Sequence, residues 1–142
     1  MEREELFFDT NSVSPTLFIG LGGSGSSIVD RVAEKLAHRD DAERYRGLVH
    51  SFAVDTNIAD LERLHNVPPG NRLLISDFDK RAYVQQKRGR SHMQADAFCT
   101  QWLPDWYDFR AARGSGAGQI RIESRLSLYY QLERDRGEII KR

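Results

Sequence analysis

The apolar positions near the start of the chain change from a continuous run to a helical spacing. Residues 16–21, TLFIGL, are almost all apolar, which is typical of a central strand covered on both faces of a parallel sheet. After a cluster of glycines, apolar residues recur at the spacing of an amphipathic helix as far as about His38. The face that we expect this helix to bury consists of Ile28, Val29, Val32, Ala33 and Leu36.

The next segments continue the alternation of strands and helices. Residues 48–54, LVHSFAV, predict a second strand, and residues 72–76, RLLIS, predict a third strand after the turn at 67–71. Between these strands, a short helix is predicted from the spacing of Ile58, Leu61 and Leu64. A strand-helix-strand-helix-strand order favours an α/β fold with a parallel sheet.

The pattern is less regular after the third strand. Residues 77–113 mix a basic piece at 87–90 with several aromatic residues and show no steady period, so we expect an irregular segment with some helix. A second glycine cluster then leads into a helix predicted from Gln119 to about Arg136. Its expected core-facing residues are Ile122, Leu126, Tyr129, Tyr130 and Leu132.

Composition narrows the class of protein. A chain of 142 residues with 39% hydrophobic residues suits one domain with one core, here residues 15–142 after a flexible lead-in at 1–14. Because Lys and Arg number 21 and Asp and Glu also number 21, no net charge draws the chain to nucleic acid or to an anionic membrane. The single Cys99 excludes an internal disulfide, and no apolar run is long enough to span a membrane. We therefore expect a cytoplasmic protein.

The first glycine cluster is the first candidate for chemistry. Residues 20–25, GLGGSG, match G-x-G-x-x-G at the point where the predicted strand passes into the predicted helix. Glycines there permit a tight turn and let backbone N–H groups approach a phosphate, which the positive end of a helix also favours. A plain tight turn is the alternative. The candidate phosphate-binding residues are Gly20, Gly22, Gly23, Ser24, Gly25 and Ser26.

The second strand leads into three polar residues, Asp55, Thr56 and Asn57, at the edge where open α/β sheets bind ligands. In a Rossmann dinucleotide-binding domain, an acidic residue about 20 positions after the glycines binds the ribose. Asp55 lies 30 positions after Gly25, so the fit is poor unless the first connection is long. An NAD(P)- or FAD-binding domain of an oxidoreductase is therefore retained as an alternative.

The second glycine cluster also precedes a predicted helix. A minimal dinucleotide site has no use for it, whereas two glycine loops at two helix N-termini suit a ligand with several phosphates. The alternative is a flexible loop that follows a long insertion. The candidate residues are Gly114, Ser115, Gly116, Ala117 and Gly118.

Together these segments resemble a known family. LFIGLGGSG resembles the V-I-G-V-G-G-G-G of FtsZ, and AVDTNIADLERL resembles its A-V-N-T-D-x-x-x-L with Asp55 and Asn57 interchanged. RGSGAGQIR is similar to R-G-L-G-A-G-A-N-P, with Gln-Ile-Arg in place of Ala-Asn-Pro. The chain thus resembles the N-terminal part of the GTP-binding domain of the tubulin/FtsZ family, particularly its bacterial tubulin-like members. The resemblance covers about residues 16–76 and 113–136 and leaves 77–112 as an insertion.

The resemblance implies the N-terminal portion of a parallel, three-layer, Rossmann-like sheet that binds GTP or GDP with magnesium (Mg²⁺). It implies that residues 22–26 hold phosphates and that Asp55, Thr56 and Asn57 line the nucleotide and its magnesium waters. Residues 116–118 would close over the γ-phosphate. The family's role would be nucleotide-dependent assembly or switching of the intact protein.

Two parts of the family's domain are missing from these residues. The signature loop G-G-G-T-G-T-G and the later catalytic acidic loop do not occur, so no catalytic residue is assigned. GTP hydrolysis is expected only in a longer or assembled protein. In the strand order 3-2-1-4, residues 16–21 would lie at an open edge, which predicts self-association or a partner chain that covers it.

Other candidate sites have weaker support. The four histidines are scattered without ligand spacing, so no metal-ligating set is expected, and Ser24 lacks the acid and histidine of a hydrolase triad. The basic residues near 80–90 are surrounded by carboxylates, which favours a solvated insertion that packs its aromatic residues on the core over a nucleic-acid surface. Trp102 and Trp106 would form an apolar anchor for a partner if exposed. A scaffold that binds no nucleotide is the remaining alternative.

Overall fold

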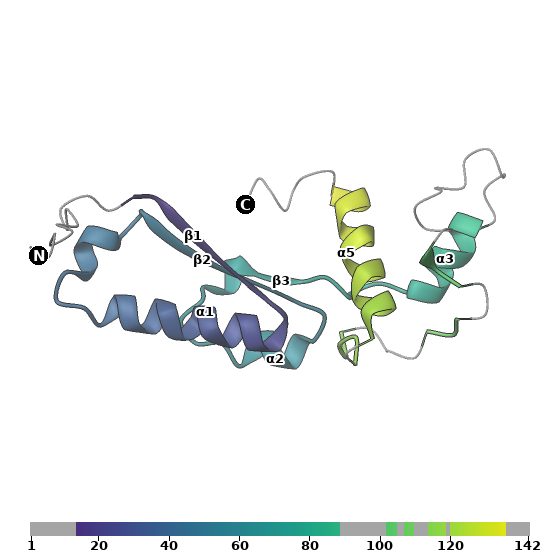
Figure 1. The fold of residues 1–142 in the computed structure, drawn as a ribbon, viewed down its shortest axis with the longest axis horizontal. Coiled ribbons are helices and arrows are strands. Elements are labelled where there is room, and N and C mark those ends of the chain that lie inside the picture. Colours follow the sequence, from purple (N-terminus) through teal and green to yellow (C-terminus); the bar gives the residue numbers. More distant parts are fainter. Residues whose placement is uncertain (1–13, 89–101, 105–106, 110–113, 119, 136–142) are drawn as a thin grey trace, which may run out of the picture.

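The computed structural model describes residues 14–88, 102–104, 107–109, 114–118 and 120–135 (Figure 1). The sheet is parallel, in the order β1-β2-β3, and helices flank it, which confirms the predicted α/β class. The predicted lead-in lies outside the described residues except for residue 14. The elements in chain order are β1 (Thr16–Leu21), α1 (Gly22–Ala37), η1 (Ala42–Tyr45), β2 (Val49–Asp55), α2 (Ile58–Glu62), η2 (Pro69–Asn71), β3 (Arg72–Leu74), α3 (Lys80–Arg88) and α5 (Arg121–Asp135).

The register of the sheet brings two predicted site segments to one edge. β1 pairs with β2 from Thr16 opposite Val49 to Leu21 opposite Val54. The two strands therefore end side by side. The first glycine cluster, which follows β1, and Asp55, which ends β2, lie at the same edge of the sheet. β3 is shorter than predicted, although the backbone N–H of Ile75 still donates to the carbonyl oxygen of Asp55 at 2.9 Å. The Ser76 hydroxyl then donates to the carbonyl oxygen of Thr56.

Helices α1 and α2 cover one face of the sheet. The core between them consists of Val29, Ala53, Leu61, Leu64 and Val67, with Phe18 and Leu74 packed against it. The prediction that Ile28 belongs to this core is wrong, because its side chain is 64% exposed. Successive residues are about 100° apart around a helix, so the turn of α1 that buries Val29 directs Ile28 to solvent.

β1 lies at an open edge of the sheet, as the expected strand order predicts. The further expectation that this strand is covered on both faces is wrong. Phe18 and Gly20 face α1, so the alternate residues point to the opposite face. Leu17 and Ile19 are each 55% exposed and Leu21 is 70% exposed, so this apolar face is open among the described residues.

A second core lies beyond the end of β3 and joins α3 to α5 (Figure 1). Phe78 stacks on Tyr130 with ring centroids 3.8 Å apart, and Leu126 of α5 is fully buried. Ile122, Leu126 and Tyr130 share one face of α5 at the spacing of four residues. The prediction that Leu132 also faces this core is wrong, since it lies off that face and is 50% exposed.

Asp30 ties α1 to the segment that follows α2. Its Oδ1 accepts hydrogen bonds from the backbone N–H groups of His65 at 3.0 Å, Asn66 at 2.7 Å and Val67 at 2.9 Å. Its Oδ2 accepts a fourth, from Asn66 Nδ2 at 3.1 Å. Burial raises the pKa of Asp30, but these donors lower it by more, so the net pKa lies below the ordinary value.

Replacing Asp30 with alanine is expected to lower the free energy of unfolding by about 2 kcal/mol at neutral pH, because the backbone donors lose a charged acceptor. The lowered folded-state pKa means that this contribution is complete above the unfolded value near 3.8 and is lost as pH falls through the folded value. The difference between wild type and variant should therefore shrink below about pH 4 in urea titrations across pH. Glu34→Ala, one turn later and exposed, should change neither the free energy of unfolding nor its dependence on pH. A difference independent of pH would contradict this account.

Candidate functional site

The first glycine cluster forms the first turn of α1 instead of a separate loop before it. α1 begins at Gly22, whose φ of 70° is accessible to glycine and strained for other residues. The N-cap is Leu21 in extended conformation, with no capping side-chain hydrogen bond and no acidic residue in the first turn. The first amides of α1 therefore lack a capping side chain from their own helix and are suited to bind an anion.

Two glycines of the motif let α1 pack against β1. A Cβ placed on Gly20 would lie 2.5 Å from the carbonyl oxygen of Gly25 and 2.7 Å from the Cα of Ser26. A Cβ on Gly25 would lie 3.3 Å from the carbonyl carbon of Gly20. These glycines, predicted as phosphate contacts, thus allow strand and helix backbones to touch. Gly22 and Ser24 are exposed on the same turn, whereas Ser26 is fully buried.

Asp55 ends β2 and turns its carboxylate toward this first turn. Its Oδ1 accepts a hydrogen bond from the backbone N–H of Asn57 at 2.9 Å. The residue is only 6% exposed, and its Oδ2 has no hydrogen-bond partner among the residues that the structure describes. A Cβ on Gly23 would lie 3.9 Å from that oxygen. A buried carboxylate oxygen without a donor is costly and fits a site that receives a cation or its water.

Thr56 and Asn57 hold the second glycine cluster. The backbone N–H of Gly116 donates to the carbonyl oxygen of Thr56 at 2.9 Å, and that of Ala117 donates to Thr56 Oγ1 at 3.0 Å. Asn57 pairs with Ser115 in an isolated antiparallel bridge. The two polar segments predicted from sequence therefore meet, although they are far apart in the chain.

The second cluster adopts backbone conformations that favour glycine. Gly114, Gly116 and Gly118 have φ values of 69°, 87° and 54°. A Cβ on Gly116 would lie 3.2 Å from the Cβ of Asn57, while one on Gly118 would meet no atom within 4 Å. The cluster is thus fixed on its Asn57 side and open at Gly118, shortly before α5 begins at Arg121.

Asp60, in the first turn of α2, also borders the candidate site, although no sequence pattern singled it out. Its Oδ2 lies 3.1 Å from the position of a Cβ on Gly23 and accepts a hydrogen bond from Asn57 Nδ2 at 2.9 Å. Asn57 also caps α2, because its Oδ1 accepts from the backbone N–H of Ala59 at 3.2 Å. The only signal for Asp60 was its place three residues after a capping asparagine, which puts both at the same end of α2.

The basic residues near 80–90 and the two tryptophans were the other candidate binding surfaces. Lys80 is buried against Glu123, Arg81 pairs with Asp108, and Lys87 pairs with Glu133. These pairs support a packed insertion over a basic nucleic-acid surface. Trp102 is half-buried, and Trp106 and Cys99 lie outside the described residues.

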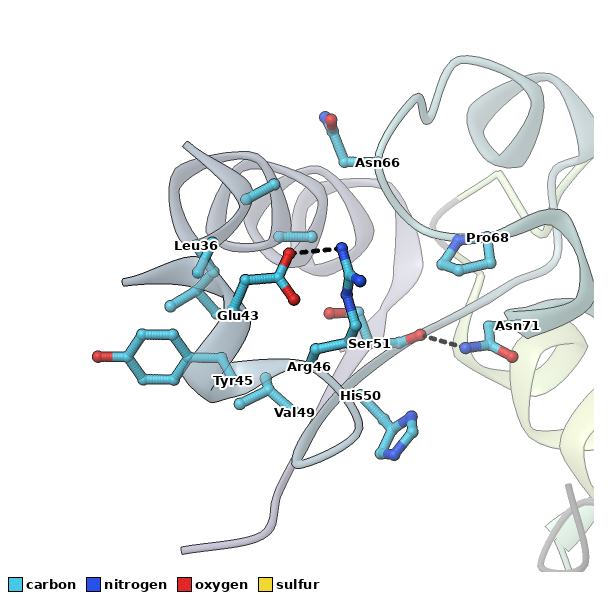
Figure 2. A pocket seen from close by; sticks show the side chains of 13 residues that line it. Leu36, Glu43, Tyr45, Arg46, Val49, His50, Ser51, Asn66, Pro68 and Asn71 are labelled. Atoms are coloured by element: carbon cyan, nitrogen blue, oxygen red, sulfur yellow. Dashed lines mark hydrogen bonds and ion pairs between the residues drawn. The ribbon is translucent and has the colours of Figure 1, made fainter. Parts of the chain in front are cut away.

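A cavity of about 370 Å³ lies where α1 ends and β2 begins (Figure 2). The glycine clusters lie at the other end of the sheet, where the strands finish. Its lining includes Leu36 of α1 and Val49 at the start of β2. The ion pair between Glu43 and Arg46, 2.7 Å long, lies beside it. The cavity contains none of the predicted site residues.

Within the described ranges, no group of three or more His, Cys, Asp or Glu residues is arranged to hold a metal ion. None of the helices in these ranges has the length and apolar character needed to cross a membrane.

Comparison with known proteins gave one finding. A family model described as tubulin like matches residues 17–142, which is most of the chain and includes both glycine clusters. Comparison with curated proteins gave no match, and comparison with solved structures gave none.

Proposed function

The chain belongs to the tubulin-like family, and from this membership we propose that it is a module that binds a guanine nucleotide, GTP or GDP. The observation that carries the proposal is the meeting of three predicted segments at one edge of the sheet. The first turn of α1 lies beside the carboxylate of Asp55, and the second glycine cluster is hydrogen-bonded to Thr56. Open α/β sheets bind ligands at the carboxyl ends of their strands.

In this proposal the two glycine clusters bind different parts of one polyphosphate. The uncapped amides of Gly22, Gly23 and Ser24 donate to phosphate oxygens at the positive end of α1. The cluster at 114–118 approaches from the other side and contacts the terminal phosphate. No residue of the chain is assigned to hydrolysis.

The residues present also fit Mg²⁺. The buried, unpartnered Oδ2 of Asp55 is the type of oxygen that magnesium or its bound water takes, and magnesium usually uses few protein ligands when phosphates supply others. When bound, the ion would neutralise phosphate charge. Asp55 and Thr56 orient the site, because both are fixed by backbone hydrogen bonds.

The proposal includes assembly or switching of the intact protein with nucleotide. Its support is the open edge of β1 with exposed Leu17, Ile19 and Leu21. Natural proteins cover such an edge with further structure or a partner. A second copy or a partner chain would do so here.

The first test is displacement of labelled GTP, bound with Mg²⁺, by unlabelled GTP, ATP or NAD. We expect GTP alone to compete. Replacing Gly23 with alanine should weaken GTP binding about tenfold, because the new Cβ enters the phosphate cradle 3.1 Å from Asp60 Oδ2. The fold should persist, since Gly23 has no positive φ and alanine favours helix.

Gly70→Ala is the matched control, because a Cβ there meets no atom within 4 Å and lies away from the site. It should bind GTP as wild type does. Better displacement by NAD would replace the proposal with the dinucleotide alternative. Absence of any nucleotide binding by the folded chain would favour the scaffold.

A further inference from the structure

Two carboxylates, from Asp55 and Asp60, face the first turn of α1. Measured from the position of a Cβ on Gly23, Asp60 Oδ2 is 3.1 Å away and Asp55 Oδ2 is 3.9 Å away. Both oxygens therefore border the point where a phosphate would approach the helix. Asp55 is 6% exposed, and its Oδ2 is unpartnered within the described part of the chain.

Asn57 holds the two carboxylates in place without neutralising them. Its backbone N–H donates to Asp55 Oδ1 at 2.9 Å, and its Nδ2 donates to Asp60 Oδ2 at 2.9 Å. The amide is neutral, so both negative charges remain. Arg63 reaches Asp60 Oδ1 at 3.4 Å, but its side chain is 79% exposed, so this pair contributes little.

The two carboxylates disfavour the binding of a phosphate without a cation. The positive end of α1 attracts an anion, but two carboxylates beside it repel one. A divalent cation between carboxylates and phosphate turns the repulsion into attraction, and Mg²⁺ commonly binds through one or two carboxylates plus substrate phosphates. Two carboxylates supply few ligands, so phosphate oxygens would complete the coordination of such a cation.

We propose that Asp60 is a second cation-positioning carboxylate, and that it makes phosphate binding at the α1 N-terminus depend on a divalent cation. This inference rests on the proposed function, since it concerns the same site. Thermodynamic linkage requires the converse too: the nucleotide must raise the affinity for the cation by the factor by which the cation raises the affinity for the nucleotide. Asp55 and Asp60 together thus act as a sensor for the metal-loaded nucleotide.

A purely structural role for Asp60 is distinguishable. Its charge also lies in the first turn of α2, where a carboxylate stabilises the helix dipole. Loss of that effect would change thermal stability and leave the cation dependence of nucleotide binding unchanged.

The test compares the dissociation constant of labelled GTP in excess Mg²⁺ with that in EDTA, for wild type and Asp60→Asn. We expect Mg²⁺ to tighten binding about 100-fold in wild type and about tenfold or less in the variant. In EDTA, Asp60→Asn should bind GTP more tightly than wild type, because one repelling charge is gone. Glu62→Gln, an exposed neighbour on α2, should behave as wild type.

The outcomes separate this inference from the proposed function. The role of Asp60 alone is overturned if both proteins bind GTP and the ratio of the dissociation constant in EDTA to that in Mg²⁺ is equal in wild type and Asp60→Asn. No binding of GTP in either condition overturns the proposed function itself. If Asp60→Asn fails to fold by circular dichroism, Asp60→Ser, which also removes the carboxylate, takes its place in the same comparison. A smaller Mg²⁺ effect on GTP binding in Asp60→Ser than in wild type supports the role, and an equal effect contradicts it.

Discussion

Replacing Gly20 with alanine is expected to lower the free energy of unfolding by about 3 kcal/mol or more, or to prevent folding. The new Cβ would lie 2.5 Å from the carbonyl oxygen of Gly25 and 2.7 Å from its carbonyl carbon and from the Cα of Ser26. All three atoms are backbone, so no side chain can rotate away. Relief requires α1 to separate from β1, which also loosens the packing of Val29 against the sheet.

Thermal unfolding followed by the helical signal in circular dichroism measures this effect. Gly70→Ala is the matched control, because its Cβ meets open space and its φ is not positive. That variant should stay within about 0.5 kcal/mol of wild type. Similar melting of Gly20→Ala and wild type would show that strand and helix are not in backbone contact.

The glycines of the first cluster have two different structural roles, and the sequence motif predicts only their location. The spacing of the glycines correctly located the passage from β1 to α1. Spacing alone does not separate a glycine that would approach a phosphate from one that packs against the protein backbone, because both positions exclude a Cβ for the same steric reason. Contact between Gly20 and Gly25 depends on how closely α1 packs on the sheet, which local spacing does not encode.

The strands and the longer helices were predictable because the spacing of apolar residues along each segment is typical of that kind of element. β1 has the predicted bounds, and β2 and α5 differ by one or two residues at their ends. Which side chains are covered was less predictable. Leu21 and Ile28 are apolar and exposed, because burial depends on which elements are present to cover a face.

The candidate site was predictable in part. Parallel strands that end side by side bring Asp55 to the first glycine cluster, and topology alone implies this. The meeting of Thr56 with Gly116 and Ala117 joins residues far apart in sequence. Two glycine clusters that each precede a helix suggested one shared ligand, and the resemblance placed both clusters at the same nucleotide. Asp60 was not predicted as a site residue, because α2 was predicted from the spacing of its apolar residues alone.

The second core was the least predictable region. Lys80 was interpreted as part of a solvated basic segment, yet its side chain is 3% exposed and its Nζ lies 2.6 Å from Glu123 Oε2. Tyr107 donates from its hydroxyl to Glu123 Oε1 at 3.1 Å, which satisfies the second carboxylate oxygen. A charge pair 43 residues apart in sequence leaves no local signal, because each residue resembles a surface residue until its partner is known.

Breaking this pair is expected to have the other large effect on stability. Glu123→Leu leaves the Lys80 ammonium buried without its counter-ion and should lower the free energy of unfolding by about 3–5 kcal/mol in urea. Lys80→Met should cost less, because Tyr107 still donates to the remaining carboxylate.

The double variant Lys80→Met/Glu123→Leu provides the decisive comparison. It removes both charges and should recover to within about 2 kcal/mol of wild type, since well-packed apolar residues often replace a buried ion pair at little cost. Glu43→Gln, which breaks the exposed pair with Arg46, should change stability by less than about 0.5 kcal/mol. Additive losses in the double variant would contradict a direct interaction between the two charges. The recovery would instead establish that desolvated charge, and not lost volume, sets the cost of either single change.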